Sequence, residues 1–180
     1  RERGEGGSAA AARLCVSCRV VREVRSKHCR QCDRCVVAFD HHCPWIGSCV
    51  AKRTHRPFIA FLLTAAVTVA LWLSVATRYV ATVTTSLSTM PLFWAIFAIA
   101  IPTLGGGYAV VLLLQAWRLL GRALTTNEAI NWRRYHYLSR DGNGHGGYKN
   151  PFDRGSVAAN LREFAVRGVS ASVGGSRGGG

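Results

Sequence analysis

Two long stretches without a charged side chain dominate the pattern of hydrophobic and polar positions along this chain. Phe58 to Thr77 form the first, and at ~1.5 Å per residue a helix of these twenty residues reaches about 30 Å, the thickness of a bilayer's hydrocarbon core. The second runs from Pro91 to Trp117. Trp94 lies near its start and Trp117 at its end, and tryptophan rings favour the headgroup region of a membrane. The pattern predicts a hairpin of two transmembrane helices.

The second run also contains residues that disturb a helix. Pro102 lacks the N–H that a helix needs, and the glycines at 105–107 loosen the backbone, so we expect a kink that neighbouring helices tolerate. The alternative to two spans is a buried helical hairpin of a soluble protein. Charge-free runs of this length are rare in soluble cores, which favours the membrane interpretation.

The basic residues lie almost entirely outside these two runs. The 180-residue chain carries a formal charge of +14, with twelve Lys and Arg before residue 58, Arg78 between the runs, and ten after Trp117. Positively charged flanks stay on the cytoplasmic side of a membrane, so both termini are predicted to be cytoplasmic. This topology accounts for the excess charge without a nucleic-acid partner, although an anionic leaflet or the phosphates of a coenzyme can also use it.

All seven cysteines lie in the basic segment before the first run. A cytoplasmic location argues against disulfides, whereas C-x2-C pairs with nearby histidines are typical of tetrahedral zinc sites. Two sites of three cysteines and one histidine each use six of the seven cysteines and leave one over. The array is Cys15-x2-Cys18-x9-His28-Cys29-x2-Cys32-x2-Cys35-x6-His42-Cys43-x5-Cys49.

Cys43 is the candidate for the cysteine without a metal. It directly follows His41 and His42 and precedes Pro44. A closed structural zinc site occupies its own thiolates, so any chemistry falls to the cysteine that remains. The alternative is a purely structural zinc knuckle that binds a partner and catalyses nothing.

Spacing and hydropathy together predict the fold class. We expect a mainly α membrane protein, with a zinc-binding Cys-rich domain of short hairpins and loops, two transmembrane helices and a short amphipathic C-terminal helix. That last helix is expected to follow the turn at Asn150-Pro151-Phe152 and to run through Leu161 and Phe164. No internal repeat is expected. The predicted segments are a disordered leader (1–12), the cytoplasmic Cys-rich catalytic domain (13–56), a transmembrane helix (57–78), an extracytoplasmic loop (79–90), a second transmembrane helix (91–117), a cytoplasmic C-terminal segment (118–167) and a disordered tail (168–180).

The tetrapeptide Asp40-His41-His42-Cys43, inside the cysteine array and just before a membrane span, carries a family resemblance. It resembles the motif of the DHHC (Asp-His-His-Cys) protein S-acyltransferases, or palmitoyltransferases, and looks closest to their ankyrin-repeat-bearing branch. The resemblance resumes at Thr125-Thr126-Asn127-Glu128, at Asn150-Pro151-Phe152 and at Asn160. Such enzymes have additional membrane spans, so the chain is expected to be a fragment that lacks the N-terminal spans.

The resemblance implies roles for individual residues. It implies that Thr126 helps to hold Asp40. A helix N-cap formed by Thr125 with Glu128 is the alternative for that motif. Asn160 is implied to make structural hydrogen bonds. The implied zinc ligands are Cys15, Cys18, His28 and Cys35 for one ion, and Cys29, Cys32, His42 and Cys49 for a second.

The expected function is protein S-acyl transfer through Cys43. A thiol needs a neighbouring base, and His41, oriented by Asp40, is expected to supply it. The resemblance implies a ping-pong reaction in which Cys43 takes a palmitoyl or other fatty acyl chain from acyl-CoA and passes it to cysteines of client proteins. We expect an integral protein of the Golgi, endoplasmic reticulum or plasma membrane, in contact with membrane lipid. The alternative is a non-catalytic membrane-anchored zinc-binding interaction module, or an inactive fragment of the family.

Overall fold

The computed structural model describes residues 14–83, 89–139 and 147–169, of which 83 and 89–92 are described as backbone only. The expected leader at 1–12 and most of the expected tail at 168–180 lie outside these residues. Contacts within the chain divide it into two units. We call residues Pro57–Trp117 the helical hairpin, and the segments before and after them the Cys-rich unit.

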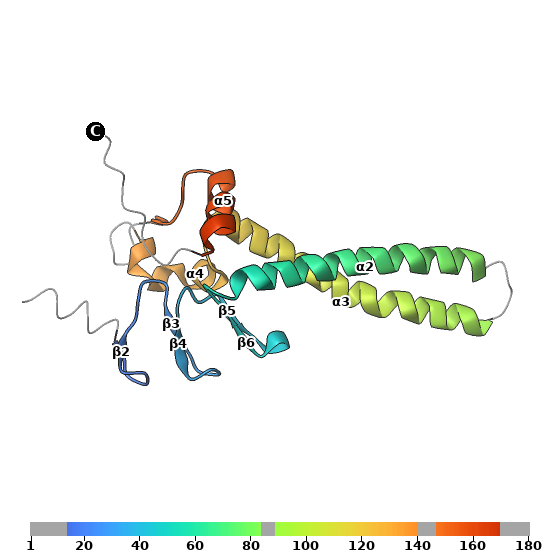
Figure 1. The fold of residues 1–180 in the computed structure, drawn as a ribbon, viewed down its shortest axis with the longest axis horizontal. Helices are drawn as coiled ribbons and strands as arrows, with labels where there is room; N and C mark the ends of the chain where they lie inside the picture. Colours follow the sequence, from blue (N-terminus) through green and yellow to red (C-terminus); the bar gives the residue numbers. More distant parts are fainter. Residues whose placement is uncertain (1–13, 84–88, 140–146, 170–180) are drawn as a thin grey trace, which may run out of the picture. The chain divides into compact units, whose positions relative to one another are not determined.

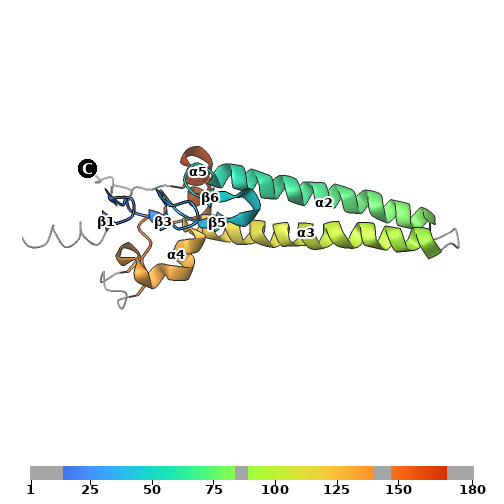
Figure 2. The same ribbon diagram turned by 90° about the horizontal axis from the view of Figure 1, so that it is seen from below.

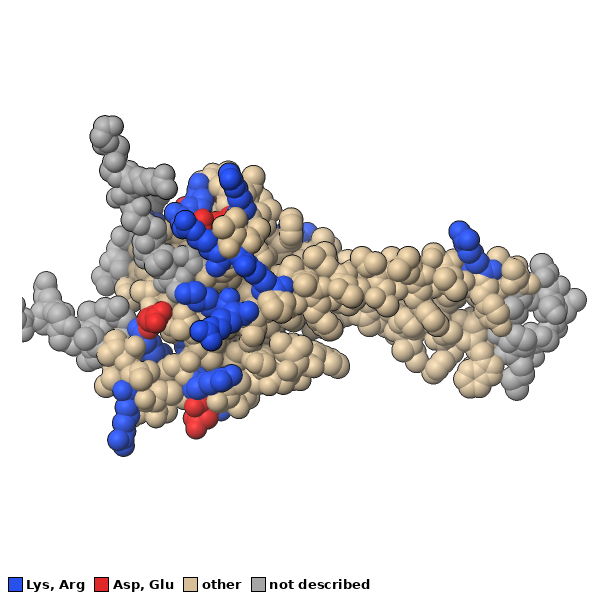
Figure 3. All heavy atoms as spheres, in the orientation of Figure 1, with Lys and Arg blue, Asp and Glu red and all other residues tan. Residues whose placement is uncertain are grey.

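The helical hairpin is formed by α2 (His55–Val83) and α3 (Thr89–Gly121), which run alongside each other in Figures 1 and 2. Residues His55–Thr82 and Phe93–Gly121 are long and apolar enough to cross a membrane. Only 17% and 11% of their most apolar windows are buried within the described chain, whereas a core helix of a soluble protein is mostly buried. Figure 3 shows a hairpin surface almost without charge. The expected mainly α membrane protein with two spans is confirmed.

The two helices approach each other closely at Gly106. A Cβ atom there would overlap the side chain of Val69, so glycine permits a separation that larger residues would prevent. The indole Nε1 of Trp72 donates to the carbonyl oxygen of Ala98 at 2.9 Å and so links α2 to α3. α3 continues on both sides of Pro102. The glycine therefore serves the packing of two helices rather than loosening one.

The Cys-rich unit begins with three antiparallel hairpins of two or three residues per strand. Arg19, Asp33 and Gly47 lie in the three turns, and their φ values of 54°, 45° and 58° let the chain reverse sharply. Strands this short are only marginally stable in water, so strand pairing alone does not hold them. The pairs are β1 (Leu14–Cys15) with β2 (Val20–Val21), β3 (Lys27–Cys29) with β4 (Arg34–Val36), and β5 (His41–Cys43) with β6 (Ser48–Val50).

Short helices complete the Cys-rich unit. Thr125 caps α4 in a capping box with Glu128, and the hydroxyl of Ser156 caps α5 by accepting from the N–H of Ala159. The amphipathic C-terminal helix expected from the sequence is α5. In chain order these elements are α4 (Thr126–Asn131), η2 (Trp132–Arg134), η3 (His136–Leu138) and α5 (Val157–Arg167).

An arginine side chain ties the end of α5 to the segment that follows the hairpins. The guanidinium of Arg56 donates to the carbonyl oxygens of Phe164 at 3.1 Å and Ala165 at 2.7 Å. These carbonyls belong to the last turn of α5, where a positive charge is favoured by the helix dipole. The C-terminal helix is thereby fixed within the Cys-rich unit.

Candidate active site and metal sites

The three hairpins bring cysteine and histidine side chains into two clusters that can each hold a metal ion. In each cluster the ligand atoms all lie within 4.8 Å of one another. A C-x2-C turn supplies two thiols, and a cross-strand His–Cys pair supplies the other two ligands. Three thiols and an imidazole in such a closed group suit a tetrahedral structural site. The first cluster is Cys15, Cys18, His28 and Cys35, and the second is Cys29, Cys32, His42 and Cys49.

The second cluster repeats the first with a fixed offset. Every ligand of the second cluster lies fourteen residues after its counterpart in the first. The strand register repeats as well, since His28 faces Cys35 across β3 and β4, and His42 faces Cys49 across β5 and β6. The expectation that the chain has no internal repeat was therefore wrong. The repeat was missed because only the metal ligands recur, while the residues between them differ.

Without a bound cation, one thiol in each cluster, Cys35 in the first and Cys49 in the second, resists losing its proton. Burial raises the pKa of Cys35 to about 12, and the neighbouring thiols of Cys15 and Cys18 add to that increase. The pKa of Cys49 is likewise raised to about 12 by burial and by Cys29 and Cys32. A divalent cation reverses this balance, because it binds the thiolates and releases the protons. The chemistry of both donor sets therefore fits a metal ion.

Cys43 belongs to neither cluster. It is buried, with 5% of its surface exposed, at the end of β5. Side chains alternate along a strand, so Cys43 and His41 lie on one face of β5 and the metal-ligating His42 lies on the other. The strand thus separates a thiol with a neighbouring imidazole from the cluster.

Asp40 fixes the orientation of His41. Its carboxylate oxygen Oδ2 lies 2.7 Å from His41 Nδ1, and its Oδ1 accepts from the backbone N–H of Thr126 at 2.6 Å. Burial alone would raise the pKa of the Asp40 carboxyl, but these hydrogen bonds outweigh it and hold that pKa below its usual range. An ionised carboxylate at Nδ1 leaves Nε2 as the nitrogen of His41 that can take up a proton.

Thr125 and Thr126 divide the two roles that the sequence left open. The side-chain oxygen of Thr125 accepts from the N–H of Glu128 at 3.2 Å, and Glu128 Oε2 accepts from the N–H of Thr125 at 2.9 Å. Thr126 reaches Asp40 through its backbone N–H. The N-cap of α4 and the contact to Asp40 are therefore adjacent parts of one arrangement, not alternatives.

A buried ion pair anchors α4 to the β3–β4 hairpin. The guanidinium of Arg25 donates to Glu128 at 2.7 Å through Nε and at 2.5 Å through a terminal nitrogen, and both side chains are almost fully buried. Lys27 Nζ donates to Asn127 Oδ1 at 3.0 Å in the same region. Tyr137 donates its hydroxyl to Glu128 at 3.1 Å. These contacts hold the N-terminus of α4 where Thr126 meets the Asp40 carboxylate.

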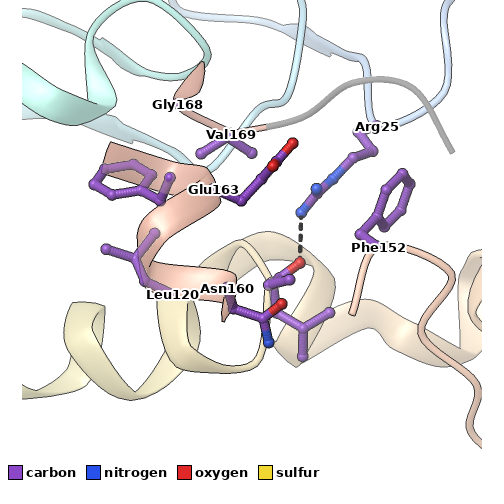
Figure 4. Close-up of a pocket in the computed structure, with 10 residues that line it drawn as sticks. Arg25, Leu120, Phe152, Asn160, Glu163, Gly168 and Val169 are labelled. Atoms are coloured by element: carbon purple, nitrogen blue, oxygen red, sulfur yellow. Dashed lines mark hydrogen bonds between the residues drawn. The ribbon is translucent and has the colours of Figure 1, made fainter. Parts of the chain in front are cut away.

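Arg25 also packs against the C-terminal part of the unit, as Figure 4 shows. Its guanidinium carbon lies 4.1 Å from the ring centroid of Phe152, and it donates to the carbonyl oxygen of Ala123 at 3.1 Å. Asn160 Nδ2 donates at 2.8 Å to the carbonyl oxygen of Gly121 beside them. The pocket enclosed here has a volume of about 30 Å³, which suits a single water and not a substrate.

The sequence did not single out Arg25 as part of this arrangement. Arg25 lies 103 residues from Glu128, and one arginine among 23 basic residues carries no signal of its partner. The positive φ of Arg25, 65°, is also invisible in its residue type. The capping-box spacing of Thr125 and Glu128 was the only local hint that this glutamate is held in place.

Comparison with known proteins agrees with this geometry. The family model for the DHHC palmitoyltransferase matches residues 9–133. Palmitoyltransferase AKR1 of Mortierella alpina is 33% identical over 150 residues, which cover 71% of this chain and 26% of the relative. Palmitoyltransferase Hip14 of Drosophila melanogaster is 33% identical over 164 residues, covering 85% and 25%. Palmitoyltransferase ZDHHC17 of Mus musculus is 33% identical over 181 residues, covering 92% and 28%.

The chain spans about a quarter of the length of the curated relatives that it matches. The match nevertheless covers most of this chain, including both metal clusters, the strand that bears Cys43, and α4. The chain belongs to the DHHC palmitoyltransferase family.

Proposed function

We propose that this chain is the catalytic part of a protein S-acyltransferase, which moves a fatty acyl chain such as palmitoyl from acyl-CoA to cysteines of client proteins. Cys43 carries the acyl chain between donor and client. The observation that supports this most strongly is the position of Cys43, outside both metal clusters and on the same face of β5 as His41. Family membership agrees with the proposal, as do the relatives, which are palmitoyltransferases by name.

In the first half-reaction Cys43 becomes the acyl-enzyme. His41 Nε2 takes the proton of the Cys43 thiol, and the resulting thiolate attacks the carbonyl carbon of the acyl-CoA thioester. The carbon–sulfur bond to coenzyme A then breaks, and the coenzyme A thiolate leaves with the proton from His41. Asp40 holds His41 in the required tautomer and stabilises its protonated form, which its hydrogen bond of 2.7 Å supports.

In the second half-reaction the acyl chain leaves Cys43. A cysteine thiol of a client protein loses its proton to His41 and attacks the thioester carbonyl on Cys43. The bond to Cys43 breaks, and the Cys43 thiolate regains the proton from His41. The same base thus serves both halves, as a ping-pong reaction requires.

Each Cys3His cluster is proposed to hold one zinc ion. Zinc prefers this donor set in closed structural sites. The strands here are too short to stay paired without such a cross-link. Through His42 the second cluster fixes β5, which carries His41 and Cys43 on its other face. The zinc ions therefore position the reacting side chains and take no part in bond making.

Both ends of the described chain are proposed to face the cytoplasm, in a Golgi, endoplasmic reticulum or plasma membrane. The distribution of Lys and Arg around the two spans supports this orientation. A long acyl chain gains about 0.8 kcal/mol per methylene group buried in the membrane. Fourteen residues separate Cys43 from Phe58, which lets the acyl chain stay in lipid while its thioester reacts on Cys43.

Autoacylation of the purified chain tests the proposal. Detergent-solubilised protein carrying two zinc ions is incubated with labelled palmitoyl-CoA beside Cys43→Ser. We expect label on the wild type that hydroxylamine releases, because hydroxylamine cleaves thioesters, and none on the variant. If the zinc-loaded wild type takes up no more label than Cys43→Ser, the proposal is wrong and a non-catalytic zinc-binding module becomes the better description.

A further inference from the structure

A hollow in the Cys-rich unit has no part in the proposed reaction. It has a volume of about 660 Å³ and lies between β4, β6 and the turn at 51–54. This volume falls within the range of about 300–1,000 Å³ that is usual for small-molecule sites. Arg34, Lys52 and Arg53 line it, with Glu23 as the one acidic side chain in the lining.

The three basic side chains that line the hollow are exposed and have no recorded partner. Among the described residues, Arg34, Lys52 and Arg53 make neither an ion pair nor a side-chain hydrogen bond. Arg56, close to them in sequence, is by contrast occupied with the carbonyl groups at the end of α5. Three cationic side chains and one carboxylate line the hollow, so guanidinium and ammonium groups without a partner are open to an anion.

The charge of the metal clusters does not account for the basic residues of the Cys-rich unit as a whole. Six thiolates with two zinc ions would lower the formal charge of +14 by only two. The basic residues of this unit therefore far exceed what the clusters need for neutrality.

The walls of the hollow are held in place before any ligand arrives. Cys35 of the first cluster and Cys49 of the second both line it, so metal ions held by the two clusters would fix both sides. The turn between them is fixed by Thr54, whose hydroxyl donates to the carbonyl oxygen of Cys49 at 2.7 Å and accepts from the N–H of Ala51 at 2.9 Å. Such a preformed site loses little conformational entropy when it binds.

Two of the basic residues that line the hollow lie close in sequence to the first span. Lys52 and Arg53 precede Pro57, the first residue of the helical hairpin, by five and four positions. A chain of that length spans at most about 18 Å even when fully extended. For a span that enters the membrane at Pro57, lipid phosphates lie within about that distance of these two residues.

We infer that this hollow binds the headgroup of an anionic lipid that carries more than one phosphate. Arginine guanidinium groups pair with phosphate oxygens through two parallel hydrogen bonds, and lysine adds a point charge. Ser48 lines the hollow and lies opposite Cys43 in the β5–β6 hairpin. A bound headgroup therefore steadies the hairpin that carries Cys43, and the binding itself does not depend on acyl transfer.

A titration with short-chain lipids tests the inference. The full chain in detergent, in the Cys43→Ser form and with two zinc ions confirmed, is titrated with dioctanoyl phosphatidylinositol bisphosphate and separately with dioctanoyl phosphatidylserine. We expect saturable binding of the bisphosphate lipid, at least about tenfold tighter than that of the serine lipid. The variant Arg34→Gln/Lys52→Gln/Arg53→Gln should lose at least about tenfold in affinity.

A matched variant removes the same charge elsewhere. Arg30→Gln/Arg133→Gln/Arg162→Gln changes three exposed arginines outside the hollow and should bind the lipid as the parent does. Equal loss of affinity in both triple variants, or equal affinity for the two lipids, would show that overall charge alone governs binding and would overturn the inference. Displacement of the lipid by free coenzyme A at similar concentration would also overturn it, because the hollow would then belong to the acyl donor.

Discussion

The β3–β4 and β5–β6 hairpins have the same register but different uses for one cysteine. In both, a histidine faces a cysteine across the strands and is followed by another cysteine, Cys29 in β3 and Cys43 in β5. Cys29 has a second thiol three residues later, Cys32, and enters a metal cluster. The matching position after Cys43 is Ile46, so no C-x2-C pair forms there. One missing thiol therefore separates a structural cysteine from a free one.

The comparison also explains why the β5–β6 hairpin stays stable although Cys43 binds no metal. β5 and β6 still receive His42 and Cys49 as metal ligands, so the strand pair is fastened through residues next to Cys43. The repeat supplies a rigid frame, and its last cysteine is left without the partners that would bind its sulfur to a metal. A nucleophile placed in this way is held in position by neighbouring metal ligands, while its own thiol does not bind the metal.

The largest expected effect comes from replacing each of the two comparable cysteines by serine. Cys29→Ser should lose one metal ion per chain and much of the fold, because a structural zinc site contributes on the order of 10 kcal/mol to a small domain. Cys43→Ser should keep two metal ions and its melting temperature. Metal content by mass spectrometry, with circular dichroism melts, measures both. A metal lost from Cys43→Ser would show that the two hairpins are more alike than described.

The next effect concerns two aspartates beside histidines, one buried and one exposed. Asp40→Asn should slow autoacylation by about 100-fold or more, since it removes the carboxylate that orients His41. Asp33, whose side chain is 91% exposed and lies 3.6 Å from His28 Nε2, is the matched control. Asp33→Asn should change the rate by less than about twofold, because exposed pairs contribute little. Similar rates for the two variants would remove His41 from the proposed mechanism.

The third effect concerns stability and compares a buried with an exposed ion pair. Glu128→Gln should lower the free energy of unfolding by about 3–5 kcal/mol, because it leaves the buried Arg25 guanidinium without its counter-charge. Glu163, which pairs with Arg154 and Arg167 at the surface, is the control, and Glu163→Gln should cost less than about 1 kcal/mol. Denaturant titration of the two variants gives the difference directly. A small loss at Glu128 would mean that α4 is anchored mainly by its other contacts.

Local spacing made most of this molecule predictable from its sequence. The two spans follow from uncharged length, and α5 from a turn followed by apolar positions one helical turn apart. The ligand sets came from a resemblance, and the structure gathers the same eight residues into two clusters. Spacing alone left the assignment of individual cysteines open, because several pairings of seven cysteines satisfy the same rule.

Contacts between distant segments could not be predicted in this way. The pair of Arg25 with Glu128 joins the turn between β2 and β3 to a helix far along the chain, and nothing in either segment specifies the other. The contact of Thr126 with Asp40 was implied by the family resemblance, whereas local spacing gave no sign of it. The hydropathy pattern also did not predict where the two helices end. α2 continues past Arg78 to Val83, and α3 begins at Thr89, within the loop expected at 79–90.

The alternation of ligands along the chain has a consequence for how this unit is made. Cys29 and Cys32 of the second cluster precede Cys35, the last ligand of the first, so the ligands of the two clusters interleave along the sequence. No cut between them yields an independent module, because any fragment that holds one complete cluster also holds part of the other. During synthesis, the first cluster is complete only when Cys35 has emerged and the second only after Cys49. The first cluster therefore has all its ligands before the second does, and two ligands of the second are already present when the first can close.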